Sequence, residues 1–170
     1  MHYYIDGYNV IHKSSLLRPL AQQDFETARE SLIDKVAQLC AAAQQECTIV
    51  FDGQAAYHPE LAPHQRAVHN LHIYYSPKTI SADAVIERWV YKAKNRLEVC
   101  VVSNDQGLRA LCRNMGALTM EADHFLATVR EIQHDISKTI ERTRQPAPPS
   151  LEESLDPESL ERLRRLRDHL

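Results

Sequence analysis

Glycine is scarce in this chain, and its cysteines stand apart from one another. Only four of the 170 residues are glycine, which argues against the glycine-rich loops that cradle nucleotide phosphates. The four cysteines form no Cys-x-x-Cys pair, so they offer neither a structural zinc motif nor a dithiol redox motif. We expect all four to be buried, reduced thiols, as in a cytoplasmic protein.

Long apolar runs and an excess of positive charge are also missing. No apolar run is long enough to cross a bilayer, and nothing resembles a signal peptide, because the first predicted strand begins almost at residue 1. The formal net charge is -3, so a nucleic-acid partner would need a local basic patch or bound cations. The chain is 44% hydrophobic and 25% charged, which is ordinary for a globular domain.

Strand and helix patterns alternate along the chain. Alternating or apolar runs predict strands at 3–5, 47–53, 71–75, 98–102 and 117–120. Helical spacing of apolar residues predicts helices at 25–43, 82–95, 107–115 and 123–143, with Asp24 and Ser81 as N-caps of the first two. The alternation predicts an α/β fold with a central, mostly parallel five-stranded sheet and helices on both faces.

The composition changes near residue 145. We predict one domain over 1–145, a stiff proline-rich linker over 146–150 and a helical tail over 151–170. In the tail, Asp156 is placed as an N-cap and Pro157 as the first helical residue. The tail either docks on the domain or a partner, or stays mobile. Residues 53–70 show no clear period and predict a long loop, with or without a short helix.

Acidic residues recur where the predicted strands end. Asp6 and Asp52 close the first two strands, and Asp105 lies just past the fourth. Asp83 opens the helix after the third strand, and Glu87 follows one turn later on the same helix face. Because parallel strands all end at one edge of the sheet, where ligands of such sheets bind, we expect these carboxylates to gather there.

A shared carboxylate site predicts a hard divalent cation. Mg²⁺ or Mn²⁺ suits all-oxygen ligands and would offset the mutual repulsion of the carboxylates. Such a site can hydrolyse a phosphodiester, because the metal lowers the pKa of its water and neutralises developing charge. Asn9, Ser103 and Asn104 are placed to orient a carboxylate or to bind a phosphate as accessory residues.

Each acidic residue also has a simpler explanation. Asp6 and Asp52 precede glycine, and Asp-Gly commonly forms a turn. Asp83 and Asp105 could serve helix N-termini, and Glu87 could be a solvated helix residue. We favour the shared site because four acidic positions follow successive strand ends.

Four stretches in this order, YIDGYNVIH, VFDG, SADAVIERWV and VVSNDQGLRAL, resemble the YacP-like NYN domain family of the PIN-like nucleases. The resemblance covers about residues 1–130. It implies a PIN-like three-layer α/β/α sandwich and metal-dependent endoribonuclease activity. By position, the residues that match the family's acidic site are Asp6, Asp52, Asp83 and Asp105, and those that match accessory positions are Asn9, Glu87 and Ser103. Asn104 departs from the family pattern, where a small hydroxyl residue is frequent.

The resemblance also implies partners. The family includes a ribosome-associated endonuclease that cuts mRNA during translation, so RNA, mRNA in particular, is the expected substrate and the ribosome a candidate partner. Basic residues near the strand ends or the following helices are candidates for phosphate contacts, with ordinary solvated surface an equal alternative: Lys13, Arg18, Lys78 and Arg109.

A histidine cluster is the other candidate metal site. His58, His64, His69 and His72 fall in the loop and the third strand. Their spacings fit no standard structural zinc pattern, so a solvated loop is favoured over a zinc site.

Three functions remain open from the sequence. The first is a Mg²⁺- or Mn²⁺-dependent endoribonuclease that leaves a 3′-hydroxyl and a 5′-phosphate, as the resemblance implies. The second is a non-catalytic RNA- or ribosome-binding module on the same fold. The third, a nuclease of structured DNA, is disfavoured because the chain lacks a long helical insertion for clamping DNA.

Overall fold

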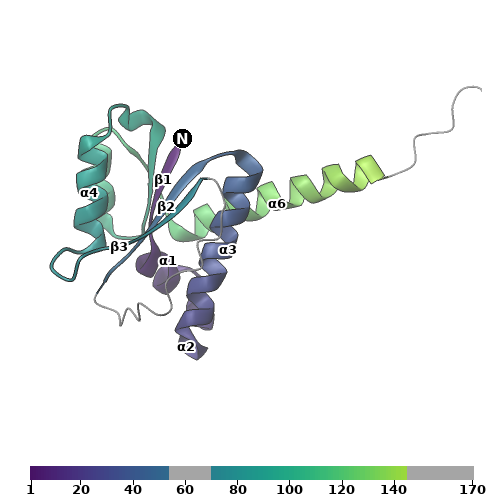
Figure 1. The fold of residues 1–170 in the computed structure, drawn as a ribbon, viewed down its shortest axis with the longest axis horizontal. Coiled ribbons are helices and arrows are strands. Elements are labelled where there is room, and N and C mark those ends of the chain that lie inside the picture. The colour runs from purple at the N-terminus through teal and green to yellow at the C-terminus, as the bar shows by residue number, and fades with distance from the viewer. Residues whose placement is uncertain (54–69, 145–170) are drawn as a thin grey trace, which may run out of the picture. The chain divides into compact units, whose positions relative to one another are not determined.

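A five-stranded parallel sheet forms the centre of the fold (Figure 1). The structure is a computed structural model and describes residues 1–53 and 70–144. The strand order is β3-β2-β1-β4-β5, and every neighbouring pair is parallel. The strands are β1 (His2–Asp6), β2 (Glu46–Phe51), β3 (Leu71–Tyr75), β4 (Val99–Val102) and β5 (Leu118–Met120).

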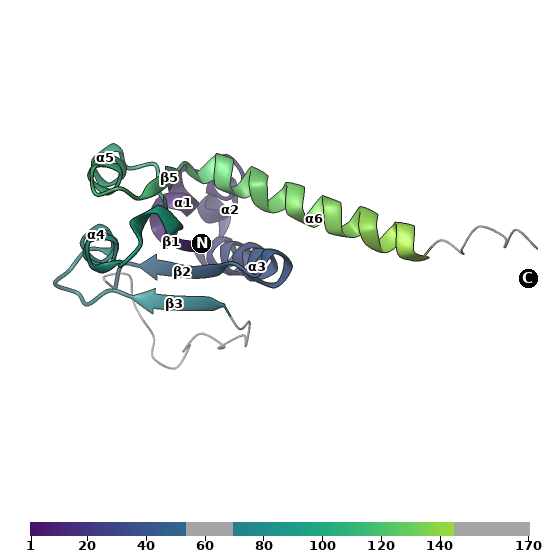
Figure 2. The same ribbon diagram turned by 90° about the horizontal axis from the view of Figure 1, so that it is seen from above.

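Helices cover both faces of the sheet (Figure 2). The helices α4 (Ala82–Lys92) and α5 (Gln106–Asn114) lie on one side, and α3 (Phe25–Ala43) and the start of α6 (Ala122–Arg144) lie on the other. The short helices α1 (Gly7–Lys13) and α2 (Arg18–Gln23) follow β1, and a 3-10 turn, η2 (Arg96–Glu98), precedes β4.

Each face of the sheet has its own hydrophobic core. On the α3 side, Ile5 and Ile49 of the sheet pack with Leu32 of α3 and Phe125 of α6, all fully buried or nearly so. On the α4 side, Val50 and Val101 of the sheet pack with Ile86, Val90 and Leu108. Burial of apolar surface on both faces holds the layers together, and the strand ends are left to carry polar residues.

The predicted fold class is confirmed, and several elements begin where their caps predict. The α3 helix has the predicted bounds, and Asp24 accepts hydrogen bonds from the amides of Glu26 and Thr27. Ser81 caps α4 through the amide of Ala84. All four cysteines are buried and free.

Two helices were not predicted, and one ends earlier than predicted. The α1 helix begins at an Asp-Gly pair, which is also typical of a turn, and the α2 helix follows it. Asp6 instead caps α1 by accepting a hydrogen bond from the amide of Asn9, and Pro19 stands in the first turn of α2, where proline is tolerated. The predicted helix 82–95 ends at Lys92 because Ala93 takes an extended backbone.

The domain boundaries stay a prediction. The linker at 146–150, the tail at 151–170 and most of the predicted loop at 53–70 lie outside the described residues. Within the described ranges, no helix has the length and apolar character needed to cross a membrane.

Candidate acidic site at the carboxyl edge of the sheet

Asp6 is the buried member of the acidic set. It ends β1, the central strand, and only 5% of its surface is exposed. One carboxylate oxygen accepts a hydrogen bond from the amide of Asn9 at 3.2 Å, and the other accepts one from the hydroxyl of Ser103 at 3.3 Å. Asp6 is therefore held in place by the start of α1 on one side and by the end of β4 on the other.

Asp83 completes a carboxylate pair with Asp6. The pKa of Asp6 is raised to about 7, first by burial and then by the charge of Asp83, against the opposing effect of the hydrogen bond from the amide of Asn9. The pKa of Asp83 is also raised, first by burial and then by the charges of Asp105 and Asp52. The structure thus brings Asp83 within electrostatic reach of each of the other three predicted aspartates.

Asp52 fixes the start of α4 beside the end of β2. Its Oδ1 accepts hydrogen bonds from the amide of Ala82 at 2.9 Å and from the hydroxyl of Ser76 at 3.3 Å. Ser76, buried just after β3, also accepts a hydrogen bond from the amide of Gly53 at 3.2 Å. Sequence reasoning missed Ser76, although it follows β3 as Ser103 follows β4, and that parallel was the available signal.

Asp105 caps α5 at the exposed side of the site. Its Oδ1 accepts a hydrogen bond from the amide of Leu108 at 2.8 Å, and its own amide donates to the hydroxyl of Ser103 at 3.1 Å. The hydroxyl of Ser103 therefore links Asp6 and Asp105 across two neighbouring strands, β1 and β4. Ser103 is fully buried, which keeps this link rigid.

Asn9 and Asn104 brace the site. The Oδ1 of Asn9 accepts a hydrogen bond from the amide of Asn104 at 2.7 Å, and the Oδ1 of Asn104 accepts one from the amide of Ala122 at 2.8 Å. This series of bonds ties α1, the loop after β4 and the start of α6 together. Both side-chain oxygens are used by the fold, and the amide nitrogens are the groups left to donate to a phosphate.

Glu87 and the predicted basic residues lie around this centre. Glu87 is exposed one turn beyond Asp83, and Arg109 forms an ion pair with Glu121 at 2.7 Å. Lys13, in the last turn of α1, is exposed about 10 Å along the helix from Asp6. Arg18, which opens α2, and Lys78, in the loop between β3 and α4, are also exposed.

The chemistry of the side-chain oxygens at this edge fits a hard divalent cation. The acidic oxygens come from four aspartates, and none of them forms an ion pair with a lysine or arginine of the described ranges. Asp6 and Asp83 repel each other when both are ionised, and a divalent ion between them would offset that repulsion. As the side chains stand, no three acidic, histidine or cysteine residues in residues 1–53 and 70–144 are grouped tightly enough to hold one ion.

Most of the predicted histidine cluster, namely His58, His64 and His69, lies outside the described residues. His72 is exposed on β3, with its Nε2 3.9 Å from a carboxylate oxygen of Glu46. Glu46 opens β2 and pairs with a residue at the start of β1, so His72 belongs to the opposite edge of the sheet from Asp52.

A family model for the YacP-like NYN domain matches residues 3–168. The chain belongs to the YacP-like NYN domain family. It is 25% identical over 139 residues to the uncharacterized protein YacP of Bacillus subtilis (strain 168), covering 81% of this chain and 80% of that protein.

Solved structures of the YacP protein have the same fold. The crystal structure of Rae1 (YacP) from Bacillus subtilis matches with a TM-score of 0.70 at 23% identity, covering 99% of this chain and 95% of that one. A mutant of the same protein matches with a TM-score of 0.69 at 21% identity, covering 98% and 99%. The match to the family model confirms the resemblance to the YacP-like NYN family, and membership of this family indicates a nuclease-type fold.

Proposed function

We propose that this YacP-like NYN protein is a Mg²⁺- or Mn²⁺-dependent endoribonuclease that hydrolyses RNA phosphodiesters. The observation that carries the proposal is the pair of Asp6 and Asp83 at the carboxyl edge: burial and the charge of Asp83 raise the pKa of Asp6 to about 7, and burial and the charges of Asp105 and Asp52 raise that of Asp83. Carboxylates that raise each other's pKa without a basic partner are typical of a catalytic or cation-binding site.

The chain's own residues have distinct tasks in this proposal. Asp6, Asp83 and Asp105 would hold the ion, which when bound lowers the pKa of a water and offsets charge developing on the phosphate. Ser103 keeps Asp6 and Asp105 at a fixed separation through its hydroxyl. Asp52 positions Asp83 indirectly, because it binds the amide of Ala82 at the start of α4. Preorganised acceptors of this kind lower the cost of reorganisation during reaction.

RNA as the substrate, mRNA in particular, and the ribosome as its setting follow from the family resemblance. Attack by water is expected to leave a 3′-hydroxyl and a 5′-phosphate. These features belong to the proposal, and cleavage is therefore tested with and without ribosomes.

The test is cleavage of end-labelled RNA by the purified full chain. We expect cleavage in Mg²⁺ or Mn²⁺ and none in EDTA. Asp6→Asn and Asp105→Asn should each lower the rate by about a hundredfold or more. Glu131→Gln, which removes one negative charge from an exposed position on α6, is the matched control and should cleave as the wild type does. Equal cleavage by wild type and both aspartate variants, with or without ribosomes, would refute the assignment.

A second candidate is a non-catalytic RNA- or ribosome-binding module. The observation that favours it is that Asp52 and Asp105 already accept hydrogen bonds from backbone amides, roles that the fold alone explains. It predicts RNA or ribosome binding without cleavage in either metal, with affinity unchanged by Asp6→Asn.

A further inference from the structure

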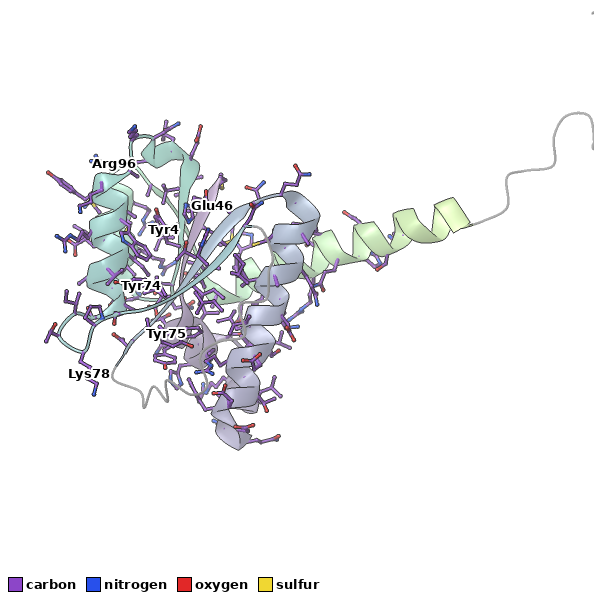
Figure 3. The ribbon with its side chains drawn as sticks, in the orientation of Figure 1. Tyr4, Glu46, Tyr74, Tyr75, Lys78 and Arg96 are labelled. Atoms are coloured by element: carbon purple, nitrogen blue, oxygen red, sulfur yellow. The ribbon has the colours of Figure 1, made fainter. Side chains whose placement is uncertain are left out.

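A row of aromatic rings crosses the α4 side of the sheet, away from the acidic site. The ring centroids of His2 and Tyr4 lie 4.3 Å apart, those of Tyr4 and Trp89 5.3 Å, and those of Trp89 and Tyr74 5.0 Å. These four residues, called the ring row below, come from β1, α4 and β3. Figure 3 shows Tyr4 and Tyr74 on the side of the sheet that faces α4.

The ring row is open at the β3 end. The buried residues of α4 pack over Val50, Val99 and Val101 of the inner strands. Tyr74, in contrast, is 38% exposed, and His72, two residues earlier on the same face of β3, is also exposed. No helix within the described ranges buries this part of the sheet, so flat aromatic surface faces outward beside α4.

Two cations lie near Trp89 along α4. Arg88 immediately precedes Trp89, and Lys92 follows Arg88 by one helical turn, so both lie along one side of α4. Both side chains are exposed, and neither forms an ion pair with a carboxylate in the described part of the chain. Aromatic faces beside unpaired cations match the bases and phosphates of a single-stranded nucleic acid.

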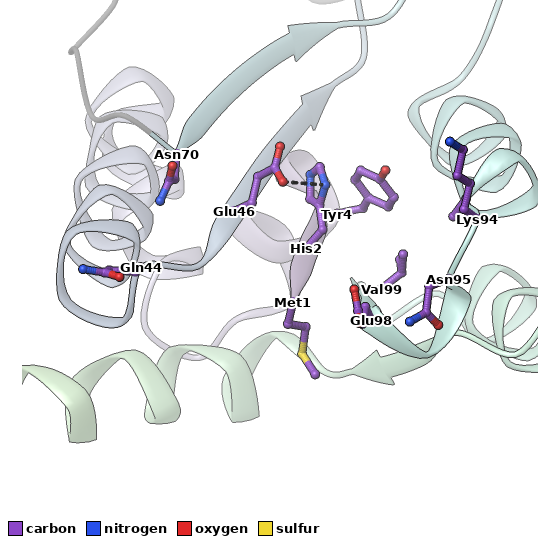
Figure 4. Close-up of a pocket in the computed structure, with 11 residues that line it drawn as sticks. Met1, His2, Tyr4, Gln44, Glu46, Asn70, Lys94, Asn95, Glu98 and Val99 are labelled. Atoms are coloured by element: carbon purple, nitrogen blue, oxygen red, sulfur yellow. Dashed lines mark ion pairs between the residues drawn. The ribbon is translucent and has the colours of Figure 1, made fainter.

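The two ends of the ring row meet features that suit an RNA chain. At one end, Tyr74 is two residues before Ser76, whose hydroxyl binds Asp52 of the acidic site. At the other end, His2 and Tyr4 line a pocket of about 500 Å³ near the start of the strands (Figure 4). Asn70, Asn95 and Lys94 also line this pocket and offer donors and acceptors to the edge of a base. Two acids line it as well: Glu46, which pairs with His2, and Glu98, which is exposed.

We propose that single-stranded RNA lies along the ring row, with nucleotides flanking the cleavage position stacked on Tyr74 and Trp89. The inference rests on the proposed endoribonuclease function for the direction of the path, from the acidic edge toward the pocket. A five-residue strand spans roughly 16 Å, so a few unstacked nucleotides are enough to reach from the acidic edge to the pocket. The pocket holds one base at the far end of this path.

Binding of labelled RNA to the full chain in EDTA tests the path without requiring catalysis. For an RNA of about 12 nucleotides, Tyr74→Ala should weaken binding about tenfold, and Tyr74→Phe should restore it, because stacking needs the ring and not the hydroxyl. Arg88→Glu with Lys92→Glu should weaken binding and lower the slope of log affinity against log salt by about 1. Arg130→Glu, an exposed charge change on α6, is the control for charge and should change affinity less than the α4 pair does.

Cleavage then separates this inference from the proposed function. In Mg²⁺, the Tyr74→Ala variant should show a raised KM on the long RNA, with kcat unchanged, and a smaller change on a dinucleotide, which has no further nucleotides to stack on the ring row. Tight RNA binding by the wild type that none of these variants alters would overturn the path and leave the acidic site untouched. Absence of cleavage by the wild type as well as by every variant, with or without ribosomes, while RNA binding stays sensitive to Tyr74, would refute the nuclease function and not the path. A wild-type chain that binds no RNA in any buffer overturns the path as well.

Discussion

Asp6 combines three tasks in one side chain. It ends the central strand, caps α1, and lies against Asp83 at a position with 5% exposure. A carboxylate so placed is costly to ionise, because burial and a neighbouring carboxylate both disfavour the charge. The site is therefore expected to lower the stability of the metal-free protein above neutral pH.

The stability of the metal-free protein should fall as pH rises. The pKa of Asp6 is about 7 in the folded chain, against 3.8 for an ordinary aspartate, so the folded state holds more protons between these values and loses stability as they are released. Asp6→Asn keeps the capping oxygen and carries no charge. At a pH of about 8 its melting temperature should be several degrees above that of the wild type, and at a pH of about 4 the two melting temperatures should be equal. Thermal unfolding in EDTA, with Glu131→Gln as control, measures this. A wild type whose stability is flat across this range contradicts the burial argument.

The side chain of Asn104 stabilises the fold. Its Oδ1 accepts a hydrogen bond from the amide of Ala122, a residue with no exposed surface. Asn104→Ala leaves that buried amide unpaired and should cost about 1–3 kcal/mol of unfolding free energy, whereas Asn104→Asp retains an acceptor oxygen and should cost less. Denaturant unfolding of the two variants decides the matter, and equal stability of Asn104→Ala and the wild type would return Asn104 to a purely functional role.

At the scale of elements, the strand ends do more than form turns. Both glycines that follow an acidic strand end are in tight places: a Cβ on Gly7 would lie 2.3 Å from the ring of Phe51, and one on Gly53 would lie 2.0 Å from the carbonyl oxygen of Ser76. The Asp-Gly pairs therefore reflect close packing around the site as well as chain reversal. Because an Asp-Gly pair is equally typical of a simple turn, the sequence does not indicate that α1 begins at Gly7.

Substitutions of Asp105 can distinguish its role as the cap of α5 from the role of its negative charge. Asp105→Asn keeps an oxygen for the amide of Leu108 and removes the negative charge, so it should keep stability near that of the wild type and lose metal binding. Asp105→Ala removes both and should also lose about 1 kcal/mol of unfolding free energy. Unfolding and metal titration of both variants test the division. Metal binding that survives Asp105→Asn would place this residue outside the metal site.

At the scale of the whole molecule, the sequence patterns predict the parallel sheet and the edge at which its acidic residues gather. Strand ends and caps are local features, so Asp6, Asp52, Asp83 and Asp105 could be found from their places after successive strands. The strand order β3-β2-β1-β4-β5 depends on packing between distant elements. The ring row needs that order, because it joins β1 and β3 through Trp89 of α4, and spacing along the chain does not indicate it.

Titration of the full chain with Mn²⁺ by calorimetry tests the central claim, the shared carboxylate site, most directly. The wild type and Glu131→Gln should bind Mn²⁺, and the double variant Asp6→Asn with Asp105→Asn should not, while remaining folded in circular dichroism. Equal binding by the wild type and the double variant would contradict the shared site. A folded wild type that takes up no Mn²⁺, with RNA present or absent, would contradict it too.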